Sequence, residues 1–347
     1  MNAQDWTPAV HAYLAQAPTS PLQGRSVEPV AHWSGQDHLL WRFRVQDHPD
    51  VVVKLFTDAG QVRSRRQYRG QERFAPWGLA PEPLAYDRYP QGLPRQVLLY
   101  RWVEAPPLDL ADPPQRDALA RALAQVHRTE PSTAPGFSPH PVNLAYFWRT
   151  GQGSEGSIAQ ELARRGKVEM AHLFQELWAQ AQATMAQALP RLGPGPPGVI
   201  HGDPAVENVL WQGGQVVLLD WELYGLGDPA QEVARFLHRH HRALDDSGQK
   251  AWLTTYLAQG PTDPTLADRV HVYRRLLPLY DLTRLLRGAL GETHPLSPDQ
   301  TAFLAETLAV GFQRTAEHLW PPDRPRLDGE RLRNQCRALL AGPERSP

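Results

Sequence analysis

The segment from residue 201 to residue 208 reads His-Gly-Asp-Pro-Ala-Val-Glu-Asn and contains side chains suited to phosphoryl transfer. This chemistry needs a carboxylate that receives the proton of an attacking hydroxyl, a role that Asp203 could fill. It also needs groups that hold magnesium on nucleotide phosphates, and Asn208 and Asp220 could do this. Any one of these residues is common in turns or at strand ends. Their order and spacing together favour a phosphoryl-transfer centre.

Short strands are expected to position these three residues. Residues 190–198 form a connector rich in Pro and Gly that leads into the segment. The apolar runs Val209–Trp211 and Val216–Leu219 flank Gly213-Gly214, and this pattern predicts a hairpin. The candidate residues therefore lie on turns that bracket short strands.

The first hundred residues predict a small antiparallel sheet with one helix. Runs rich in Val, Leu, Trp and Phe predict strands at Val27–His32, Leu39–Val45, Val51–Phe56 and Val97–Val103. Asp47-His48-Pro49-Asp50 predicts the hairpin turn between the second and third strands. A helix is predicted from about Val62 to Ala75, ending before Pro76.

The remainder of the chain predicts mainly helices. Residues 157–189 carry one long or two shorter helices interrupted near Gly166, and Asp228-Pro229 has the residues of a helix start. We therefore expect an α+β protein of two lobes. A small β-rich N-terminal lobe spans residues 1–103, a larger mainly helical lobe spans residues 104–347, and a nucleotide would lie in the cleft.

Composition restricts the partners. The 347 residues contain 36 Lys plus Arg against 37 Asp plus Glu, so no overall field favours nucleic acid or an anionic membrane. The single cysteine, Cys336, excludes an internal disulfide framework and suits a reducing compartment. The N-terminal residues lack the features of a secretory signal, and no apolar run is long enough to span a membrane. We expect a cytoplasmic protein, monomer or homodimer, with a small-molecule partner.

The site motifs resemble those of a known family. They are His201-Gly202-Asp203 with Asn208, then Leu219-Asp220-Trp221-Glu222, and then Gly227-Asp228-Pro229. The first two resemble the catalytic and metal-binding loops of the protein-kinase-like superfamily. The full set is similar to the aminoglycoside phosphotransferase and choline kinase family of small-molecule kinases. The expected order of lobes agrees over most of the chain.

The resemblance implies roles for the site residues. Asp203 would orient the acceptor hydroxyl and take its proton, while Asn208 and Asp220 would bind Mg²⁺ on the phosphates of ATP. His201 would brace the loop. Kinase-like folds also place a lysine on the third strand, where it pairs with the phosphates. Lys54 fits, and it is the only lysine among residues 1–150, although a lysine in an apolar strand could instead extend to solvent at a sheet edge.

The partner of this lysine is less clear in the sequence. The family has a glutamate on the helix that follows the third strand, and the alignment places Gln67 at that position. Gln67 could hydrogen-bond Lys54 but could not neutralise it. Glu72 is the other candidate, although it also fits a solvated helix position.

Two further nucleotide contacts follow from the resemblance. The turn between the first two strands, with Ser34 and Gly35, would cover the phosphates, although its single glycine also suits an ordinary hairpin turn. The backbone around Tyr100, Trp102 and Val103 would hydrogen-bond adenine at the hinge between the lobes. A plain core strand is compatible with the same residues.

A small basic cluster, Arg63, Arg65 and Arg66, lies at the start of the predicted helix. These side chains could contact phosphate. A hydrated helix face is the favoured interpretation.

Two functions are consistent with the pattern. The first is ATP- and Mg²⁺-dependent phosphorylation of a hydroxyl on an amino-alcohol, a sugar or an aminoglycoside-like molecule. The alternative is a pseudokinase that binds nucleotide and acts as a sensor or scaffold, supported by Gln67 and the single-glycine turn. Candidate acceptor linings combine aromatic and acidic side chains that would suit a cation: Glu222, Tyr224, Asp245, Asp246, Trp252, Tyr256 and Asp281. Protein-kinase activity is disfavoured because no Ala-Pro-Glu motif follows the metal-binding loop.

Overall fold

The protein was analysed as a computed structural model, which describes residues 2–35, 37–292, 294 and 296–341. The contacts divide it into two compact units. The first unit comprises Met1–His140, Gly198–Gly227 and Arg242–Thr262, and the second comprises the ranges between and after these. These units are defined by contacts, whereas the predicted lobes are defined by function. The lobe boundary after residue 103 therefore stays a prediction.

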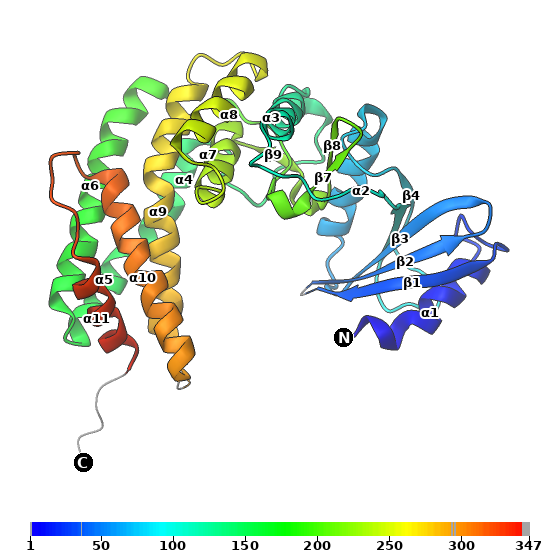
Figure 1. The fold of residues 1–347 in the computed structure, drawn as a ribbon, viewed down its shortest axis with the longest axis horizontal. Helices are drawn as coiled ribbons and strands as arrows, with labels where there is room; N and C mark the ends of the chain where they lie inside the picture. The colour runs from blue at the N-terminus through cyan, green and yellow to red at the C-terminus, as the bar shows by residue number, and fades with distance from the viewer. Residues whose placement is uncertain (1, 36, 293, 295, 342–347) are drawn as a thin grey trace. The chain divides into compact units, whose positions relative to one another are not determined.

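The first unit is built on an antiparallel sheet in the order β1-β2-β3-β5-β4, counted over the described residues (Figure 1). Its strands are β1 (Val27–Ser34), β2 (His38–Val45), β3 (His48–Phe56), β4 (Pro83–Asp87) and β5 (Val97–Arg101). Four of them confirm the sequence prediction. The strand β4 was missed because it is short, begins with proline and is only half-buried, as edge strands often are.

One face of this sheet packs on the helix α1 (Ala3–Gln16), which the sequence analysis also missed. Alternate residues of β3, Val51, Val53 and Leu55, are buried in the same core as Tyr13 and Leu14 of α1. Residues of opposite parity, among them Lys54, point to the other face because side chains alternate along a strand. The alternation therefore separates the core from the candidate site.

Two local predictions for this region have different outcomes. The helix α2 (Val62–Phe74) confirms the predicted helix. The predicted hairpin between β2 and β3 is confirmed, but its turn does not extend over Asp47–Asp50, because β3 already begins at His48. The chain reverses at Gln46 and Asp47, and Asp47 adopts φ 56°, a left-handed conformation that Asp tolerates better than most residues.

The rest of the first unit carries the candidate catalytic segment. Its elements are α3 (Pro113–His127), β6 (Gly198–Ile200), β7 (Val209–Gln212), β8 (Gln215–Leu218), β9 (Gly225–Gly227) and α8 (Asp246–Gln259). The strands β7 and β8 pair through a turn at Gly213-Gly214, both with positive φ, which confirms the predicted hairpin. The strand β6 pairs with β9. The residues from 201 to 208 thus run from the end of one short strand to the start of another.

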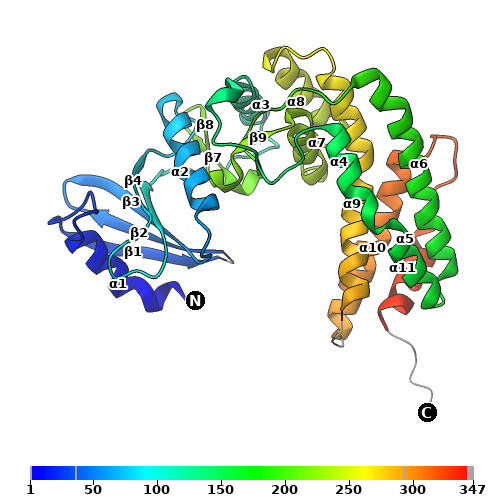
Figure 2. The ribbon, with the colours of Figure 1, turned by 180° about the vertical axis from the view of Figure 1, so that it is seen from behind.

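The second unit is helical (Figure 2). Its helices are α4 (Leu144–Gly151), α5 (Glu155–Arg164), α6 (Val168–Leu192), α7 (Pro229–Arg239), α9 (Leu266–Gly291), α10 (Pro298–Leu319) and α11 (Gly329–Leu340). The predicted interruption near Gly166 is confirmed between α5 and α6. Asp228 caps α7 as predicted, and its buried carboxylate also accepts hydrogen bonds from Arg269 and Tyr273.

The antiparallel sheet followed by a mainly helical remainder confirms the predicted α+β class. In the part of the chain that the structure describes, no helix is both long and apolar enough to cross a membrane.

His318 on α10 gives the second unit a predictable response to acid. Burial lowers the pKa of His318 to about 4, and the charges of Arg314 and Arg274 act in the same direction. The unfolded histidine titrates near 6.5, so between about pH 6.5 and pH 4 the unfolded state binds a proton that the folded state does not. Stability therefore falls as the pH falls through this window.

We expect His318→Gln to remove part of this loss, roughly 1–2 kcal/mol between pH 7 and pH 4.5. Urea unfolding of both proteins at the two pH values measures it. The control is His172→Gln, which removes an exposed histidine of α6. An identical pH dependence of wild type and His318→Gln would contradict the prediction.

Candidate active site

His201 joins the two polar loops of the first unit. Its ring is fully buried, and Nδ1 accepts a hydrogen bond from the backbone N–H of Asp203 (3.3 Å). The proton must therefore lie on Nε2, which donates to the carbonyl of Leu219 (2.9 Å). His201 thus connects the loop that carries Asp203 with the strand end that carries Asp220, in agreement with the bracing role expected for it.

Gly202 allows the two loops to approach closely. Its φ is 97°, and a Cβ at this position would lie 2.4 Å from the backbone oxygen of Leu223. Both the conformation and the space exclude a side chain. A glycine between His201 and Asp203 is therefore a requirement of this arrangement.

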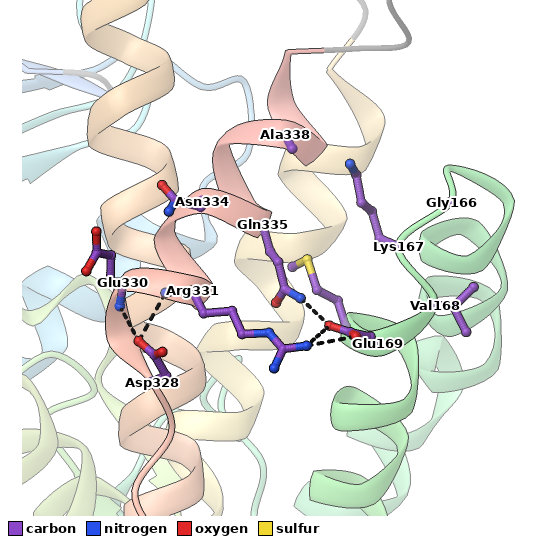
Figure 3. A pocket seen from close by; sticks show the side chains of 11 residues that line it. Gly166, Lys167, Val168, Glu169, Asp328, Glu330, Arg331, Asn334, Gln335 and Ala338 are labelled. Carbon is purple, nitrogen blue, oxygen red and sulfur yellow. Dashed lines mark hydrogen bonds and ion pairs between the residues drawn. The ribbon is translucent and has the colours of Figure 1, made fainter.

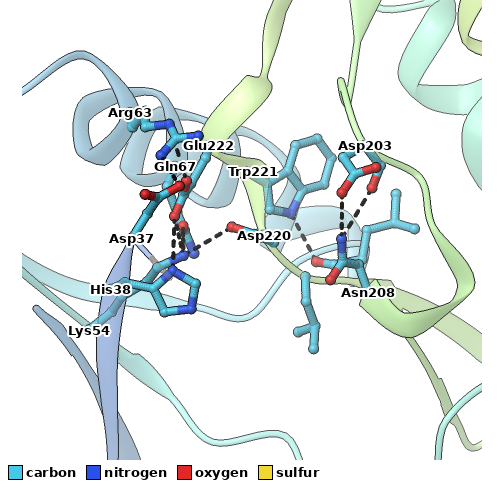
Figure 4. A network of polar contacts seen from close by, with 12 residues as sticks. Asp37, His38, Lys54, Arg63, Gln67, Asp203, Asn208, Asp220, Trp221 and Glu222 are labelled. Atoms are coloured by element: carbon cyan, nitrogen blue, oxygen red, sulfur yellow. Dashed lines mark hydrogen bonds and ion pairs between the residues drawn. The ribbon is translucent and has the colours of Figure 1, made fainter. Parts of the chain in front are cut away.

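Asp203 and Asn208 lie at the two ends of the same loop and contact each other (Figure 4). Asn208 Nδ2 donates to Asp203 Oδ2 (3.2 Å) and to the Asp203 carbonyl (3.3 Å). The Asn208 carbonyl accepts from the N–H of Leu219 (2.8 Å), which holds the loop beside the second loop. The amide oxygen Oδ1 of Asn208 has no hydrogen bond among the described residues and could serve as a metal ligand.

Asp220 follows β8 in a strained backbone conformation. Its φ is 58°, a left-handed value that few residues other than glycine adopt. Such strain often occurs at functional sites, where the surrounding structure holds the residue in place. Here the short turn Trp221–Leu223 follows directly, and the indole of Trp221 donates to the Leu218 carbonyl (2.9 Å). The buried Trp221 fixes the direction of the Asp220 side chain.

Lys54 lies at the centre of the polar network in Figure 4. The residue is only 2% exposed, and Nζ lies 2.9 Å from Asp220 Oδ1, 2.5 Å from Glu222 Oε1 and 2.7 Å from Gln67 Oε1. The alternative that Lys54 extends to solvent at a sheet edge is wrong. Its strand pairs on both sides, and its ammonium is buried against two carboxylates.

The structure gives the lysine an unexpected partner. Gln67 does hydrogen-bond Lys54, but the nearest negative charge comes from Glu222. Glu72 is exposed on the other side of α2, where it accepts from Tyr68 and Arg69. Sequence reasoning had placed Glu222 among the acceptor linings. Its position in the sequence could have indicated this pairing, because Glu222 lies only two residues after Asp220, the candidate magnesium ligand.

The two carboxylates compete for one ammonium group. Burial alone would raise the pKa of Asp220, but the charge and hydrogen bond of Lys54 hold it below its ordinary value. Burial raises the pKa of Glu222, and the charge of Asp220 adds to this effect against the attraction of Lys54. Asp220 therefore stays ionised in preference to Glu222, as a metal ligand must.

The oxygens of Asn208 and Asp220 match the preference of Mg²⁺. Among the described residues, no three His, Cys, Asp or Glu side chains gather into a metal centre. This arrangement is compatible with Mg²⁺, which commonly binds through one or two protein ligands together with substrate phosphates. The donor set of this loop pair fits the ion.

The turn between β1 and β2 contacts the same network through its second half. Arg63 Nη1 lies 2.6 Å from Asp37 and its Nε lies 3.7 Å from Glu222. The Ser34 hydroxyl accepts from the N–H of Ala3, and the Gly35 N–H donates to the His38 carbonyl. Gln36, also part of this turn, lies outside the described residues. The phosphate contacts of Ser34 and Gly35 stay a prediction.

The hinge residues follow β5. Burial raises the pKa of Tyr100, and the charges of Asp220 and Glu222 raise it further. Trp102 stacks in parallel on Trp33, with the ring centroids 6.1 Å apart. Val103 is half-buried. The adenine contacts of Tyr100, Trp102 and Val103 stay predictions.

The other suggested acceptor linings include several core residues. Tyr224, Trp252 and Tyr256 are buried, and Asp245 caps α8. Asp281 lies in the second unit beside His238, with 2.9 Å between Oδ2 and Nε2. The acceptor contacts of these residues stay predictions.

Replacing Glu222 tests its pairing with Lys54. We expect Glu222→Gln to lower kcat/KM for the nucleotide roughly tenfold, because a buried ion pair becomes a weaker contact between the ammonium and a neutral amide. Adding Gln67→Glu should restore part of the loss. The side chain at position 67 has its Oε1 atom 2.7 Å from Lys54 Nζ, so the change places a carboxylate beside the ammonium. Steady-state kinetics measures both. Glu72→Gln is the matched control, and an equal loss there would contradict the assignment.

Comparison with known proteins gives a consistent result. Residues 28–268 match the model of a family described as the phosphotransferase enzyme family. No curated protein sequence is significantly similar to the chain. Among solved structures, a choline/ethanolamine kinase family protein from Mesorhizobium loti has 17% identity and a TM-score of 0.58, and the match covers 97% of this chain and 99% of that chain.

Two further structures are similar over most of their length. A macrolide 2'-phosphotransferase from Brachybacterium faecium has 21% identity and a TM-score of 0.54, covering 91% of this chain and 99% of that chain. An ADP-bound aminoglycoside phosphotransferase has 14% identity and a TM-score of 0.55, covering 90% and 99%. At such identities the likeness shows a shared fold, and it confirms the expected kinase-like architecture.

Proposed function

The chain belongs to the phosphotransferase enzyme family, and we propose that it transfers the γ-phosphate of ATP to a hydroxyl group of a small molecule with the help of Mg²⁺. The family membership confirms the resemblance drawn from the motifs around Asp203 and Asp220. The nucleotide, the metal and the acceptor are the proposed parts.

One observation carries the proposal. Lys54, the loop with Asp203 and Asn208, and Asp220 come from three segments of the first unit, and short polar contacts link Lys54 with Asp220 and Asp203 with Asn208. His201 joins the two loops that carry the acidic residues. A proton acceptor, two oxygen ligands for a cation and a buried cation for phosphate are the parts that phosphoryl transfer needs.

Each side chain has a defined task in this proposal. Asp203 accepts the proton of the attacking hydroxyl and orients its oxygen. Asn208 and Asp220 hold Mg²⁺, which when bound neutralises charge on the phosphates. Lys54 places a positive charge beside the same phosphates, and Glu222 and Gln67 hold its ammonium in position.

The proposed acceptor is a small hydroxyl-bearing molecule such as an amino-alcohol, a sugar or an aminoglycoside. The names of the similar structures support this range, because they include a choline/ethanolamine kinase family protein and an aminoglycoside phosphotransferase. We propose a cytoplasmic enzyme, since ATP is an intracellular substrate and the chain has one cysteine.

The pseudokinase alternative rests on Gln67 and on the single glycine in the turn after β1. The contact between Glu222 and Lys54 weakens its first argument, because the lysine has a carboxylate partner even though the helix residue is neutral. This observation favours the enzyme.

The test is acceptor-dependent ADP release. Purified protein is incubated with MgATP and a panel of amino-alcohols, sugars and aminoglycosides, and phosphorylated acceptor is identified by mass spectrometry. We expect at least one acceptor to gain a phosphate. Tight ATP binding without transfer to any acceptor class would favour the sensor or scaffold.

A further inference from the structure

The outer face of α2 carries a basic hollow in the first unit. Arg65, Arg69 and Arg73 recur at intervals of four, so they share one helix face. They line a hollow of about 540 Å³. The other lining residues are Glu72, Pro76, Trp77, Thr133, Pro135 and Tyr224.

The three arginines of the basic cluster seen in the sequence therefore have different surroundings. Arg63 contacts Asp37 and Arg66 donates to the Phe137 carbonyl, whereas Arg65 belongs to the hollow.

The charges in the hollow are unbalanced. Three guanidinium groups face a single carboxylate, Glu72, which Arg69 already binds at 2.8 Å. The Arg65 side chain is exposed and makes no hydrogen bond or ion pair with any described residue. An excess of positive charge with planar N–H donors is the usual recognition pattern for phosphate.

Two shielded polar atoms in the lining lack a partner among the described residues. One is Arg73 Nε, whose guanidinium lies 4.8 Å from the ring centroid of Trp77. The other is the hydroxyl of Tyr224, a residue that is only 1% exposed. Burial raises the pKa of Tyr224 to about 12, and the charge of Arg73, which lines the same hollow, partly opposes this. Both groups can donate, so an acceptor would satisfy both.

We propose that this hollow binds a dianionic phosphoryl group, either inorganic phosphate or a small phosphate monoester. Arg65 and Arg73 supply the charge and Tyr224 donates its hydroxyl hydrogen. The ring of Trp77 and the flanking prolines offer apolar surface to the organic part of an ester.

The hollow connects with the Lys54 network through packed side chains. Phe74 of α2 stacks on Trp221, with the ring centroids 4.5 Å apart, and meets Tyr224 edge to face. A Cβ on Gly70 would lie 2.7 Å from Trp221 Cβ, so α2 lies directly against the turn between Asp220 and Tyr224. An anion bound to both α2 and Tyr224 would hold the helix that carries Gln67 against the turn that carries Glu222. Both side chains would then stay in contact with Lys54.

Binding of the anion and its effect on phosphoryl transfer can be tested separately. The site itself does not depend on the proposed activity, whereas an effect of the anion on phosphoryl transfer rests on it. The direct measurement is isothermal titration calorimetry with inorganic phosphate and with phenyl phosphate, at constant ionic strength and with saturating ADP. ADP fills the nucleotide site up to its β-phosphate, so phosphate that still binds lies either at the vacant γ-phosphate position or in the hollow, and the variants below decide between the two.

Matched variants locate the site. We expect Arg65→Gln/Arg73→Gln to weaken binding of both probes at least about tenfold, since two charge-assisted contacts are lost. The control pair, Arg121→Gln/Arg128→Gln, removes the same charge from exposed positions on or beside α3 and should leave the affinity unchanged. Tyr224→Phe should weaken binding severalfold without lowering the melting temperature of the free protein, because the lost hydroxyl has no partner there.

The two probes distinguish the sources of the ligand. Tighter binding of phenyl phosphate indicates an ester, and equal affinity indicates free phosphate; either result supports the site. Loss of phosphate binding in saturating ADP would assign the anion to the nucleotide site and overturn the proposal. An affinity unaffected by Arg65→Gln/Arg73→Gln would overturn it as well.

Discussion

Replacing Asp203 with asparagine should reduce kcat about 10²- to 10⁴-fold while leaving nucleotide binding close to that of the wild type. Asparagine has the same shape and can still accept the hydrogen bond from Asn208 Nδ2, which lies 3.2 Å from Oδ2. It cannot take up the proton of the attacking hydroxyl. The loss should therefore appear in the chemical step, which single-turnover kinetics separates from nucleotide affinity measured by calorimetry.

Glu207→Gln is the matched control, because it removes an exposed carboxylate from the same loop. We expect it to retain most of the activity. If Asp203→Asn kept more than about a tenth of kcat, another group would be the proton acceptor. Loss of nucleotide binding in Asp203→Asn would instead indicate a collapsed loop.

The second large effect is expected from Lys54→Met, which should lower kcat/KM about 10²- to 10³-fold. The variant removes the buried cation from the phosphate side of the site. It also leaves Asp220 and Glu222 without the ammonium that lies 2.9 and 2.5 Å from them. An unpaired buried charge is costly, so the folded protein should also lose stability at neutral pH.

The carboxylates of Asp220 and Glu222 determine how the stability lost in Lys54→Met depends on pH. Without the lysine the pKa of Asp220 is no longer held down and that of Glu222 rises further, so the folded state takes up protons before the unfolded chain does. The deficit in stability should therefore be largest near pH 8 and shrink towards pH 5. Urea unfolding across this range measures it, and a deficit that grows on acidification would contradict the prediction.

A double variant separates stability from catalysis. Lys54→Met/Glu222→Gln removes one of the two stranded charges, so it should recover part of the stability and none of the activity. Lys250→Met, at an exposed position on α8, controls for the loss of a lysine. Recovery of activity in the double variant would show that Lys54 acts only through folding.

Local pattern was sufficient for the elements whose residues carry their own signals. The strands around Val27, Leu39, Val51 and Val97 have continuous apolar runs, and Gly213-Gly214 marks the hairpin between β7 and β8. The edge strand β4 and the helix α1 were missed. β4 is half-buried and short, and α1 has an internal proline at position 8, so neither shows its pattern strongly.

The sequence by itself determined the order of the reacting groups. Asp203 and Asn208 lie in one short loop, and the loop geometry brings them together without help from distant elements. The resemblance to kinase-like folds, together with the absence of any other lysine among residues 1–150, selected Lys54. The contact between Asp203 and Asn208 is local, so the sequence pattern was enough to place these two candidates together.

Only the tertiary structure decided which charges meet. Glu222 and Asp220 contact Lys54 from 168 and 166 residues away. Arg65 and Tyr224 line one hollow although neither position suggests the other. Electrostatic pairing depends on distance and burial in space, and the sequence of a single chain records neither for residues so far apart.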